Sequence, residues 1–262
     1  MKWIVVLSCL LATTLAIPVN VEDDGFIGQP IEELGEHFEG DILLTDRQKQ
    51  EIFDVMVDSR TGLLNPRYRW PGNVVVYEYA DELDADQRAW VDLALANMTG
   101  HTCLTFVPRT TENDYVYVTK SSSGCFSYVG RVGGRQQLNL QDNVPGNGCW
   151  RFGTVVHEFI HALGFHHTQT AYTRNDYVII KWENIQSGTE GNFVLRDRTT
   201  TTMYGLDYDY DSVMHYGPTA FSINGEPTII PTQEGAVFGQ RNSMSPMDIQ
   251  RLNRMYDCPD GQ

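Results

Sequence analysis

Three histidines and one glutamate lie within one short stretch of the chain. On a helix, His157 and His161 are four residues apart, so both imidazoles project from the same face. Glu158 lies about 100° further round the helix, where its carboxylate can reach a bound water molecule instead of the metal. Gly164 is a residue type that ends helices in the left-handed conformation, so the chain can turn back and bring His167 to the same point. The spacing predicts a zinc site with three imidazole ligands.

Three histidine ligands leave one coordination position for water, which is typical of a catalytic zinc site. Zinc lowers the pKa of its water from about 16 toward 7, and Glu158 can then accept the proton and pass it to a leaving amine. The alternative is a chance run of histidines on a core helix. In a chain of this composition the full five-position pattern arises by chance roughly 3 times in 10⁵. We therefore expect metal-dependent hydrolysis of a peptide bond.

A second segment, which begins 45 residues after His167, reads Ser-Val-Met-His-Tyr and contains Met214 and Tyr216. Together with the histidine pattern it resembles the metzincins and, among them, the astacins. The resemblance extends from Tyr68 to Cys258. Shorter matches lie at residues 103–106, 124–130 and 239–241.

The resemblance implies an α+β fold, namely a metzincin-type catalytic domain with a twisted mixed sheet. An active-site helix would lie above a zinc cleft, and an irregular C-terminal half would end in a final helix. The three histidines would hold one Zn²⁺ per chain, with Glu158 as general base and then general acid. Met214 would form a hydrophobic floor beneath the metal. Tyr216 would bind zinc weakly at rest and then hydrogen-bond the tetrahedral oxyanion; without the resemblance, both residues would be interpreted as core side chains.

The segment Gly239-Gln240-Arg241 resembles the family segment that places an arginine in the pocket for the residue after the scissile bond. A guanidinium can hold a carboxylate there through two parallel hydrogen bonds. The alternative is that Arg241 is a surface charge paired with a nearby acid. The first interpretation predicts a preference for acidic substrates.

Residues 17–60 are strongly acidic, with 12 Asp and Glu against 3 Lys and Arg. Within them, Phe38-Glu-Gly-Asp41-Ile matches the astacin propeptide pattern, which implies that Asp41 replaces the catalytic water on zinc and keeps a zymogen inert. A solvated acidic turn is the alternative. The segment ends at Arg60-Thr61, a site of the kind that trypsin-like proteases cut.

The chain opens with Lys2, an apolar run and then small residues, which is typical of a secretory signal peptide over residues 1–16. A membrane anchor is the alternative, but the run is shorter than the about 20 residues that a spanning helix needs. We expect a secreted, extracellular protein divided into a signal peptide (1–16), a propeptide (17–60) and a protease domain (61–262). A net charge of −15 and the lack of a basic run argue against nucleic-acid partners.

Four cysteines remain once the signal peptide has left, and they allow two disulfides in three possible pairings. The resemblance implies that Cys103 pairs with Cys258 and that Cys125 pairs with Cys149. Asn97-Met-Thr is a glycosylation sequon, so a surface sugar is expected there if the site is used.

Two positions depart from the family pattern. Thr168 stands where astacins have a glutamate that helps to hold the new N-terminus, and Ala171 replaces a common arginine. Neither change touches the zinc ligands, but both affect how the mature N-terminus would be anchored. The remaining histidines of the chain are expected not to bind metal: His37, His101, His166 and His215.

Hydrophobic periodicity and capping signals predict the elements around these residues. Helices are expected over residues 46–57, from Asp84 or Asp86 past Met98, from near Arg151 to Gly164, and from a capping box at Ser245 to about Tyr256. Strands are expected over residues 73–79, 115–119 and 137–140.

The sequence thus predicts a secreted zinc endopeptidase, made as a zymogen, that hydrolyses internal peptide bonds of proteins. Its partners would be protein or peptide substrates and an activating trypsin-like protease. Two alternatives are an inactive secreted binding protein that retains the fold, and a zinc hydrolase acting on a small ester or amide. An inactive protein would be favoured by the loss of Glu158 or of a ligand, and none is missing.

Overall fold

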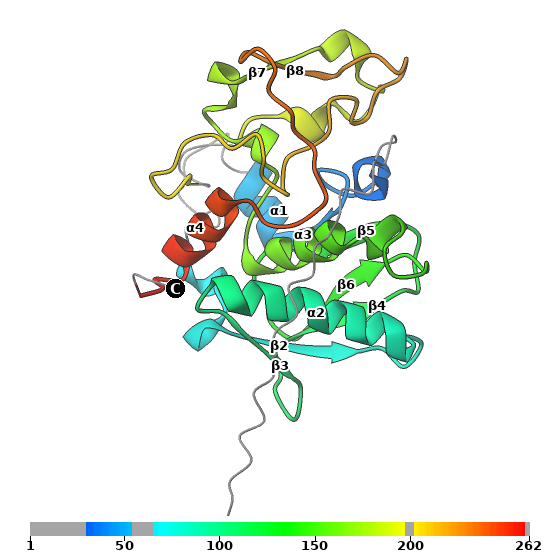
Figure 1. The fold of residues 1–262 in the computed structure, drawn as a ribbon, viewed down its shortest axis with the longest axis vertical. Helices are drawn as coiled ribbons and strands as arrows, with labels where there is room; N and C mark the ends of the chain where they lie inside the picture. Colours follow the sequence, from blue (N-terminus) through cyan, green and yellow to red (C-terminus); the bar gives the residue numbers. More distant parts are fainter. Residues whose placement is uncertain (1–29, 54–64, 197–201, 260–262) are drawn as a thin grey trace, which may run out of the picture.

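The computed structural model describes residues 30–53, 65–196 and 202–259. A six-stranded mixed sheet forms the lower part of the molecule in Figure 1 and a two-stranded sheet the upper part, with helix α3 between them. The large sheet has the order β1-β5-β6-β4-β2-β3, and all of its neighbouring pairs are parallel except β5 and β6. Its strands are β1 (Ile42–Leu43), β2 (Val74–Tyr79), β3 (Thr105–Pro108), β4 (Tyr115–Thr119), β5 (Cys125–Tyr128) and β6 (Arg135–Leu140).

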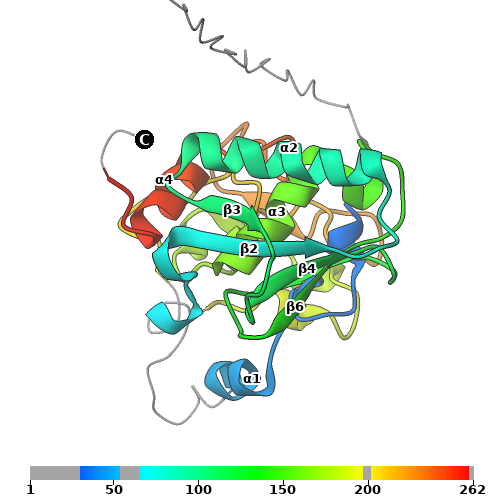
Figure 2. The same ribbon diagram turned by 90° about the horizontal axis from the view of Figure 1, so that it is seen from below.

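Helices α2 (Ala85–His101) and α3 (Phe152–Leu163) lie together on one side of this sheet, whereas α1 (Asp46–Phe53) lies apart from them, below β6 in the view of Figure 2. Helix α2 begins with a capping box. Asp84 accepts a hydrogen bond from the backbone N–H of Gln87, and the Gln87 side chain accepts one from the backbone of Asp84. The cap therefore forms at Asp84 and not at Asp86.

Helix α3 is buried along its whole length, which agrees with its apolar sequence on either side of the histidines. It ends at Gly164, whose φ of +116° is in the left-handed region that glycine favours. Near its start, a side chain at Gly153 would meet the carbonyl oxygen of Arg241 at 2.0 Å, so only glycine allows this close approach. Gly153 thus lets the start of α3 pack against the backbone of Arg241, and Gly164 lets the chain turn after the helix.

The second half of the chain has little regular structure. Strands β7 (Val178–Ile180) and β8 (Ile229–Pro231) form the antiparallel upper sheet, and α4 (Pro246–Met255) is capped by Ser245. The described residues also form 3-10 turns at Ile31–Leu34, Pro66–Tyr68, Pro71–Asn73, Gly148–Trp150, Thr168–Thr170, Arg174–Asp176, Trp182–Asn184 and Glu190–Phe193.

Two disulfides join distant parts of the domain. Cys103, after α2, is bonded to Cys258, after α4, and Cys125 in β5 is bonded to Cys149. These are the two pairs that the sequence resemblance implies. The first ties the C-terminal segment to the six-stranded half of the molecule.

The prediction of an α+β fold with a mixed sheet and a C-terminal helix is confirmed. The predicted strands at residues 115–119 and 137–140 lie within β4 and β6, and the one at 73–79 begins one residue later. The predicted helix at 46–57 extends to Phe53, and its last four residues lie outside the described part, as does the whole of 1–16. No helix in the described ranges is both long and apolar enough to cross a membrane.

Candidate metal centre

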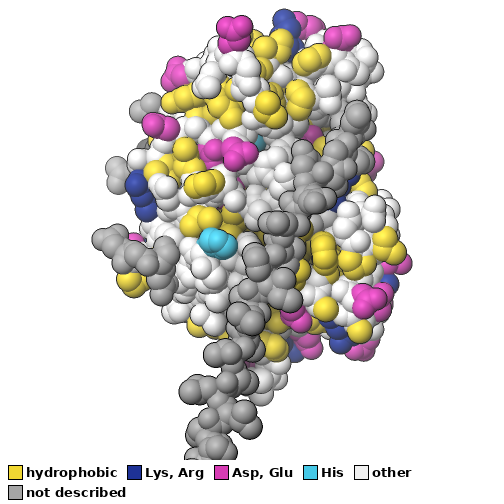
Figure 3. All heavy atoms as spheres, viewed as in Figure 1, with side chains coloured by type: hydrophobic (Ala, Val, Ile, Leu, Met, Phe, Trp, Pro, Cys, Tyr) yellow, Lys and Arg dark blue, Asp and Glu magenta, His cyan; other side chains and the backbone are white. Residues whose placement is uncertain are grey.

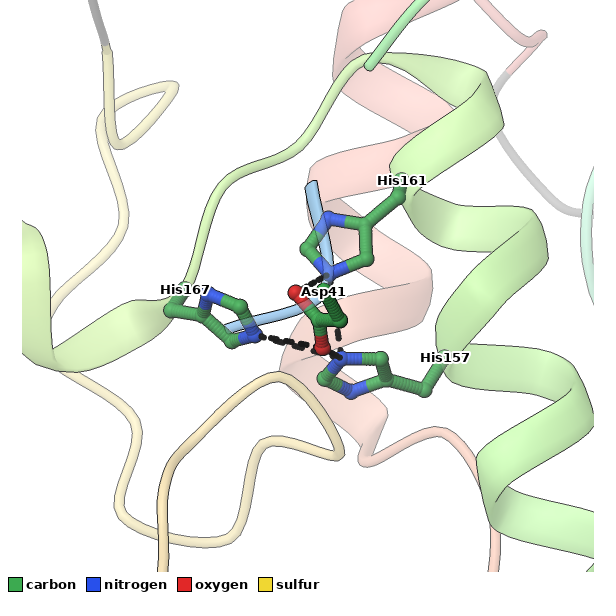
Figure 4. Close-up of side chains that lie close together, drawn as sticks. All are labelled: Asp41, His157, His161 and His167. Carbon is green, nitrogen blue, oxygen red and sulfur yellow. Dashed lines mark hydrogen bonds and ion pairs between the residues drawn. The ribbon is translucent and has the colours of Figure 1, made fainter. Parts of the chain in front are cut away.

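Four donor side chains meet beside α3: Asp41, His157, His161 and His167 (Figure 4). All four are buried, and their ligand atoms lie within 4.8 Å of one another. Asp41 Oδ2 is 3.1 Å from His157 Nε2 and 3.2 Å from His167 Nε2, and Asp41 Oδ1 is 3.3 Å from His161 Nε2. The structure therefore brings the three predicted ligands and the predicted zymogen ligand to one point.

Each histidine is oriented by a hydrogen bond from its other ring nitrogen. Nδ1 of His157 donates to the carbonyl of Val213 over 2.8 Å, and Nδ1 of His161 donates to the carbonyl of Phe165 over 2.7 Å. Nδ1 of His167 is 2.9 Å from a carboxylate oxygen of Glu39. Because these acceptors take the Nδ1 protons, all three Nε2 lone pairs face the common point. This set of three imidazoles and one carboxylate, with oriented outer partners, fits a tetrahedral zinc ion.

Burial and the carboxylates act in opposite directions on the histidines of this site. Burial lowers the pKa of His157 to about 4. Burial acts the same way on His167, but the Asp41 and Glu39 carboxylates outweigh it and raise the pKa of His167 to about 9. Burial would raise the pKa of Asp41, yet His167 and His161 hold it well below its ordinary value. The carboxylate of Asp41 is therefore charged, as a metal ligand must be.

Glu158 is fully buried, and neither of its carboxylate oxygens has a hydrogen-bond partner among the described residues. Burial and then the charge of Asp41 raise the pKa of Glu158. A buried carboxylate without a partner is rare, because the lost hydrogen bonds are costly. Glu158 directly follows His157 on α3, so this unpartnered carboxyl group lies beside the metal donors.

Met214 and Tyr216 lie close to the donor cluster. Met214 is buried in the main core and directly follows Val213, the residue that orients His157. The Tyr216 ring centroid is 4.5 Å from that of His167, and its hydroxyl donates to the backbone carbonyl of Glu39 over 2.5 Å. The described structure thus places both residues of the second sequence segment at the site.

Arg241 is buried and paired with two carboxylates from the acidic segment. Its Nε lies 2.5 Å from Glu32 Oε1, and its Nη2 lies 2.9 Å from Glu33 Oε1. Thr154 Oγ1 also donates to Glu32 (3.2 Å), and the backbone N–H of Gly217 donates to Glu33 (2.7 Å). Of the alternative for Arg241, a surface charge paired with a nearby acid, the structure shows the pairing, but the guanidinium is buried against the acidic segment.

Sequence reasoning did not identify Glu32, Glu33, Glu39 or Arg196, all of which are buried around the site. Arg196 Nε is 2.7 Å from Glu39 Oε1. The only available signal for the three glutamates was the excess of acid in residues 17–60, and this excess did not distinguish buried carboxylates from solvated ones.

The remaining histidines stay outside the donor cluster. His37 packs edge-on against Phe126, His101 is exposed at the end of α2, and His215 hydrogen-bonds the Tyr208 hydroxyl and the Tyr216 carbonyl. His166 lies 3.8 Å from Glu39 Oε1.

Five further positions bear on earlier expectations. Thr168, which stands where the family has a glutamate, is buried, and its hydroxyl donates a hydrogen bond to the hydroxyl of Ser212. Ala171 is also buried. Asn97 is half-buried on α2. Arg60 and Thr61 lie outside the described residues.

Comparison with known proteins gives a consistent result. The family model "Astacin (Peptidase family M12A)" matches residues 63–257. Seminal metalloprotease 1 of Drosophila melanogaster is 40% identical over 211 residues, which cover 78% of this chain and 84% of that protein. Zinc metalloproteinase nas-7 of Caenorhabditis elegans is 34% identical over 280 residues, with 99% and 71% covered.

Among solved structures, high choriolytic enzyme 1, a hatching enzyme zinc-protease from Oryzias latipes, superposes with a TM-score of 0.70. It is 38% identical and covers 77% of this chain and 100% of its own. Some relatives are much longer: the match to zinc metalloproteinase nas-15 of Caenorhabditis elegans (35% identical) covers 86% of this chain but 40% of that protein.

Proposed function

The chain belongs to the astacin family of zinc metalloproteinases, peptidase family M12A, and from this premise we propose that it is a secreted zinc endopeptidase made as an inert zymogen. The observation that carries the proposal is the contact of Asp41 with all three histidines (Figure 4). The carboxylate occupies the position that a catalytic site must leave open for water. Residues 17–60 therefore act as the inhibitory propeptide, and cleavage near Arg60-Thr61 by a trypsin-like protease releases it.

Bound zinc supplies Lewis acidity that polarises a peptide carbonyl and makes water a stronger acid. Glu158 takes up the proton of that water and delivers it to the leaving amine, a role that suits its unpartnered carboxylate. Tyr216 donates a hydrogen bond to the substrate oxygen on which negative charge develops. In the precursor its hydroxyl is engaged by Glu39, so Tyr216 becomes free for this role when the propeptide leaves.

The substrate pocket includes Arg241 and binds acidic side chains. Its Nη1 is held by the carbonyls of His215 and Gln240, which directs Nε and Nη2 toward Glu32 and Glu33. When the propeptide departs, these two donors, with Thr154 and the Gly217 N–H, remain for a substrate carboxylate. We assign this pocket to the residue after the scissile bond.

The remaining parts of the proposal come from the sequence. Residues 1–16 are the signal peptide, residues 61–262 the protease domain, and Asn97 the glycosylation site. The two disulfides agree with an oxidising compartment. On the face drawn in Figure 3, Lys and Arg side chains are scattered among side chains of other types.

A peptide library tests the proposal directly. Full-length protein, before and after limited trypsin treatment that is stopped with a trypsin inhibitor, is incubated with the library in the presence or absence of a zinc chelator, and Glu158→Ala serves as the matched control. We expect cleavage at internal bonds only after trypsin treatment, and its loss with the chelator or in the variant. Chelator-resistant cleavage, or none after complete processing, would contradict the proposal.

A further inference from the structure

We propose that Glu39, which lies between Phe38 and Gly40 in the propeptide segment, is a positioning residue for the metal site. The propeptide supplies it to the precursor. The Glu39 carboxylate accepts the Nδ1 hydrogen bond of His167 and so strengthens zinc binding beyond the contribution of Asp41. The inference rests on the proposed zymogen function. It predicts that the precursor and the mature enzyme hold zinc with different strengths.

The first observation is an asymmetry among the ligands. His157 and His161 are oriented by the carbonyls of Val213 and Phe165, which stay in the catalytic domain. His167 is oriented by Glu39 Oε2, which lies 2.9 Å from its Nδ1 and 3.2 Å from its backbone nitrogen. One of the three ligands therefore loses its outer partner when residues 17–60 are removed.

The second observation is that a specific buried pair holds this carboxylate in place. Glu39 Oε1 lies 2.7 Å from Arg196 Nε, and both side chains are buried. The Arg196 guanidinium lies 4.5 Å from the ring centroid of Phe38. The backbone N–H of Arg196 donates a hydrogen bond to the carbonyl of Thr170. A buried carboxylate is costly unless an opposite charge accompanies it, so the ion pair with Arg196 makes this position available to Glu39.

The third observation is the backbone conformation. Glu39 has a φ of +47° and Gly40 a φ of +82°, so two successive residues adopt the left-handed region. This turn points the Glu39 carboxylate at His167 and the Asp41 carboxylate at the cluster two residues later. A side chain at Gly40 would meet the carbonyl oxygen of Glu32 at 2.7 Å. A non-glycine residue adopts such a φ rarely, and here the contacts of both its carboxylate and its carbonyl hold it.

A carboxylate behind a metal-bound histidine fixes the tautomer and orientation of the ring and makes it a better ligand. Loss of such an outer partner typically weakens metal affinity by about 10–100-fold. Removal of the propeptide therefore takes away one direct ligand and one outer partner together. The mature site is expected to exchange its metal more readily for both reasons.

Zinc release to a chromophoric chelator tests the inference on the full-length precursor. Glu39→Ala is expected to release zinc about 10–100-fold faster than wild type, and Glu39→Gln to lie between them, because its amide oxygen accepts the bond without the charge. Glu36→Ala, which removes an exposed acid of the same segment, is the matched control and should behave as wild type. After processing, the mature enzymes from all four precursors have one sequence and must release zinc at one rate.

Residual peptidase activity of each unprocessed precursor is measured in parallel, to show whether the segment is still docked. Fast zinc release from a latent Glu39→Ala precursor supports the inference. Zinc release from Glu39→Ala at the wild-type rate overturns the inference. Fast zinc release together with full loss of latency also overturns it, because Glu39 would then be needed to keep the whole propeptide in place. A wild-type precursor that is active before processing contradicts the zymogen proposal instead, which keeps the two failures distinct.

Discussion

The carboxylates of Asp41 and Glu158 are both fully buried, and after burial itself the charge of Asp41 is the next largest cause of the raised pKa of Glu158. A protonated Glu158 cannot accept a proton from water. In the zymogen that we propose, Asp41 would therefore oppose catalysis twice, since it would take the open position among the histidines and would also favour the protonated form of the base. Departure of the propeptide would remove both contributions of Asp41.

The first prediction concerns Glu158. Glu158→Ala removes the proton acceptor but none of the three histidine ligands, so we expect mature activity to fall by about 10²–10⁴-fold while zinc remains bound. Peptidase assays and metal analysis on the same sample measure the two quantities. Zinc lost together with activity would mean that Glu158 is needed to build the site, and activity near wild type would mean that another group is the base.

The second prediction concerns latency. Asp41→Ala removes the carboxylate that lies 3.1–3.3 Å from the three imidazoles, so the unprocessed variant should cleave peptides or activate much faster than wild type. Asp46→Ala, which removes an exposed acid of the same segment, is the control. Unchanged latency in Asp41→Ala would leave the propeptide a steric plug whose carboxylate is dispensable.

The donor set could be predicted because its pattern is local. The spacing of His157 and His161, the glycine after the helix and His167 lie within eleven residues, and a helix converts that spacing into geometry. Asp41 was found differently, through a short pattern that resembles a family propeptide. Capping signals likewise located the starts of α2 and α4 at Asp84 and Ser245.

The contacts around this set could not be predicted, because they join residues far apart in the sequence. Arg241 meets Glu32 across 209 positions, and no local pattern shows which of twelve acids becomes buried. Strand β1 has only two residues, and it exists because β5 offers a parallel edge to it. Such pairings depend on tertiary context more than on propensity.

The third prediction concerns the disulfides. In the chain-entropy model, closing the 155-residue span between Cys103 and Cys258 stabilises the fold by about 5 kcal/mol, and the 24-residue span between Cys125 and Cys149 by about 3.5 kcal/mol. Replacing the first pair by serines should therefore lower the free energy of unfolding more. Denaturant titration of the two double variants measures this, and the reverse order would show that local packing, not chain entropy, decides the effect.

The fourth prediction concerns pH. Burial, opposed by Arg241, raises the pKa of Glu33 from 4.5 to about 7 in the precursor. The folded precursor therefore holds the proton of the Glu33 carboxyl more tightly than the unfolded chain does. The resulting stabilisation is complete below pH 4.5 and is lost as the pH rises through about 7, with a total of about 3 kcal/mol.

Thermal unfolding of the precursor between pH 5 and 8 tests this, with Glu33→Gln as the comparison. Wild type should lose stability relative to the variant as the pH rises, because the amide carries no charge to bury. If the unfolding temperatures of wild type and Glu33→Gln differ by a constant amount across this pH range, the raised pKa of Glu33 is contradicted. Asp41 and Glu39, whose pKa values are lowered, titrate below this window and affect both proteins equally.

The last prediction concerns substrate choice. In the precursor, Arg241 donates to two carboxylates at once, so its guanidinium already has the orientation that an acidic substrate needs. A charge-assisted hydrogen bond in such a buried pocket contributes about 1.5–3 kcal/mol, which corresponds to about 10- to 150-fold in kcat/KM. Mature enzyme should therefore prefer Glu or Asp over Ala or Gln after the scissile bond by that factor.

Cleavage of matched peptides by wild type, Arg241→Ala and Arg241→Lys measures the effect. We expect the preference to vanish in Arg241→Ala and to shrink in Arg241→Lys, because an ammonium keeps the charge but lacks the planar fork. Thr154→Val removes one neutral donor from the same pocket and should reduce the preference only slightly. A profile indifferent to acid, or an acidic preference that survives in Arg241→Ala, would show that the propeptide carboxylates use this pocket for latency alone.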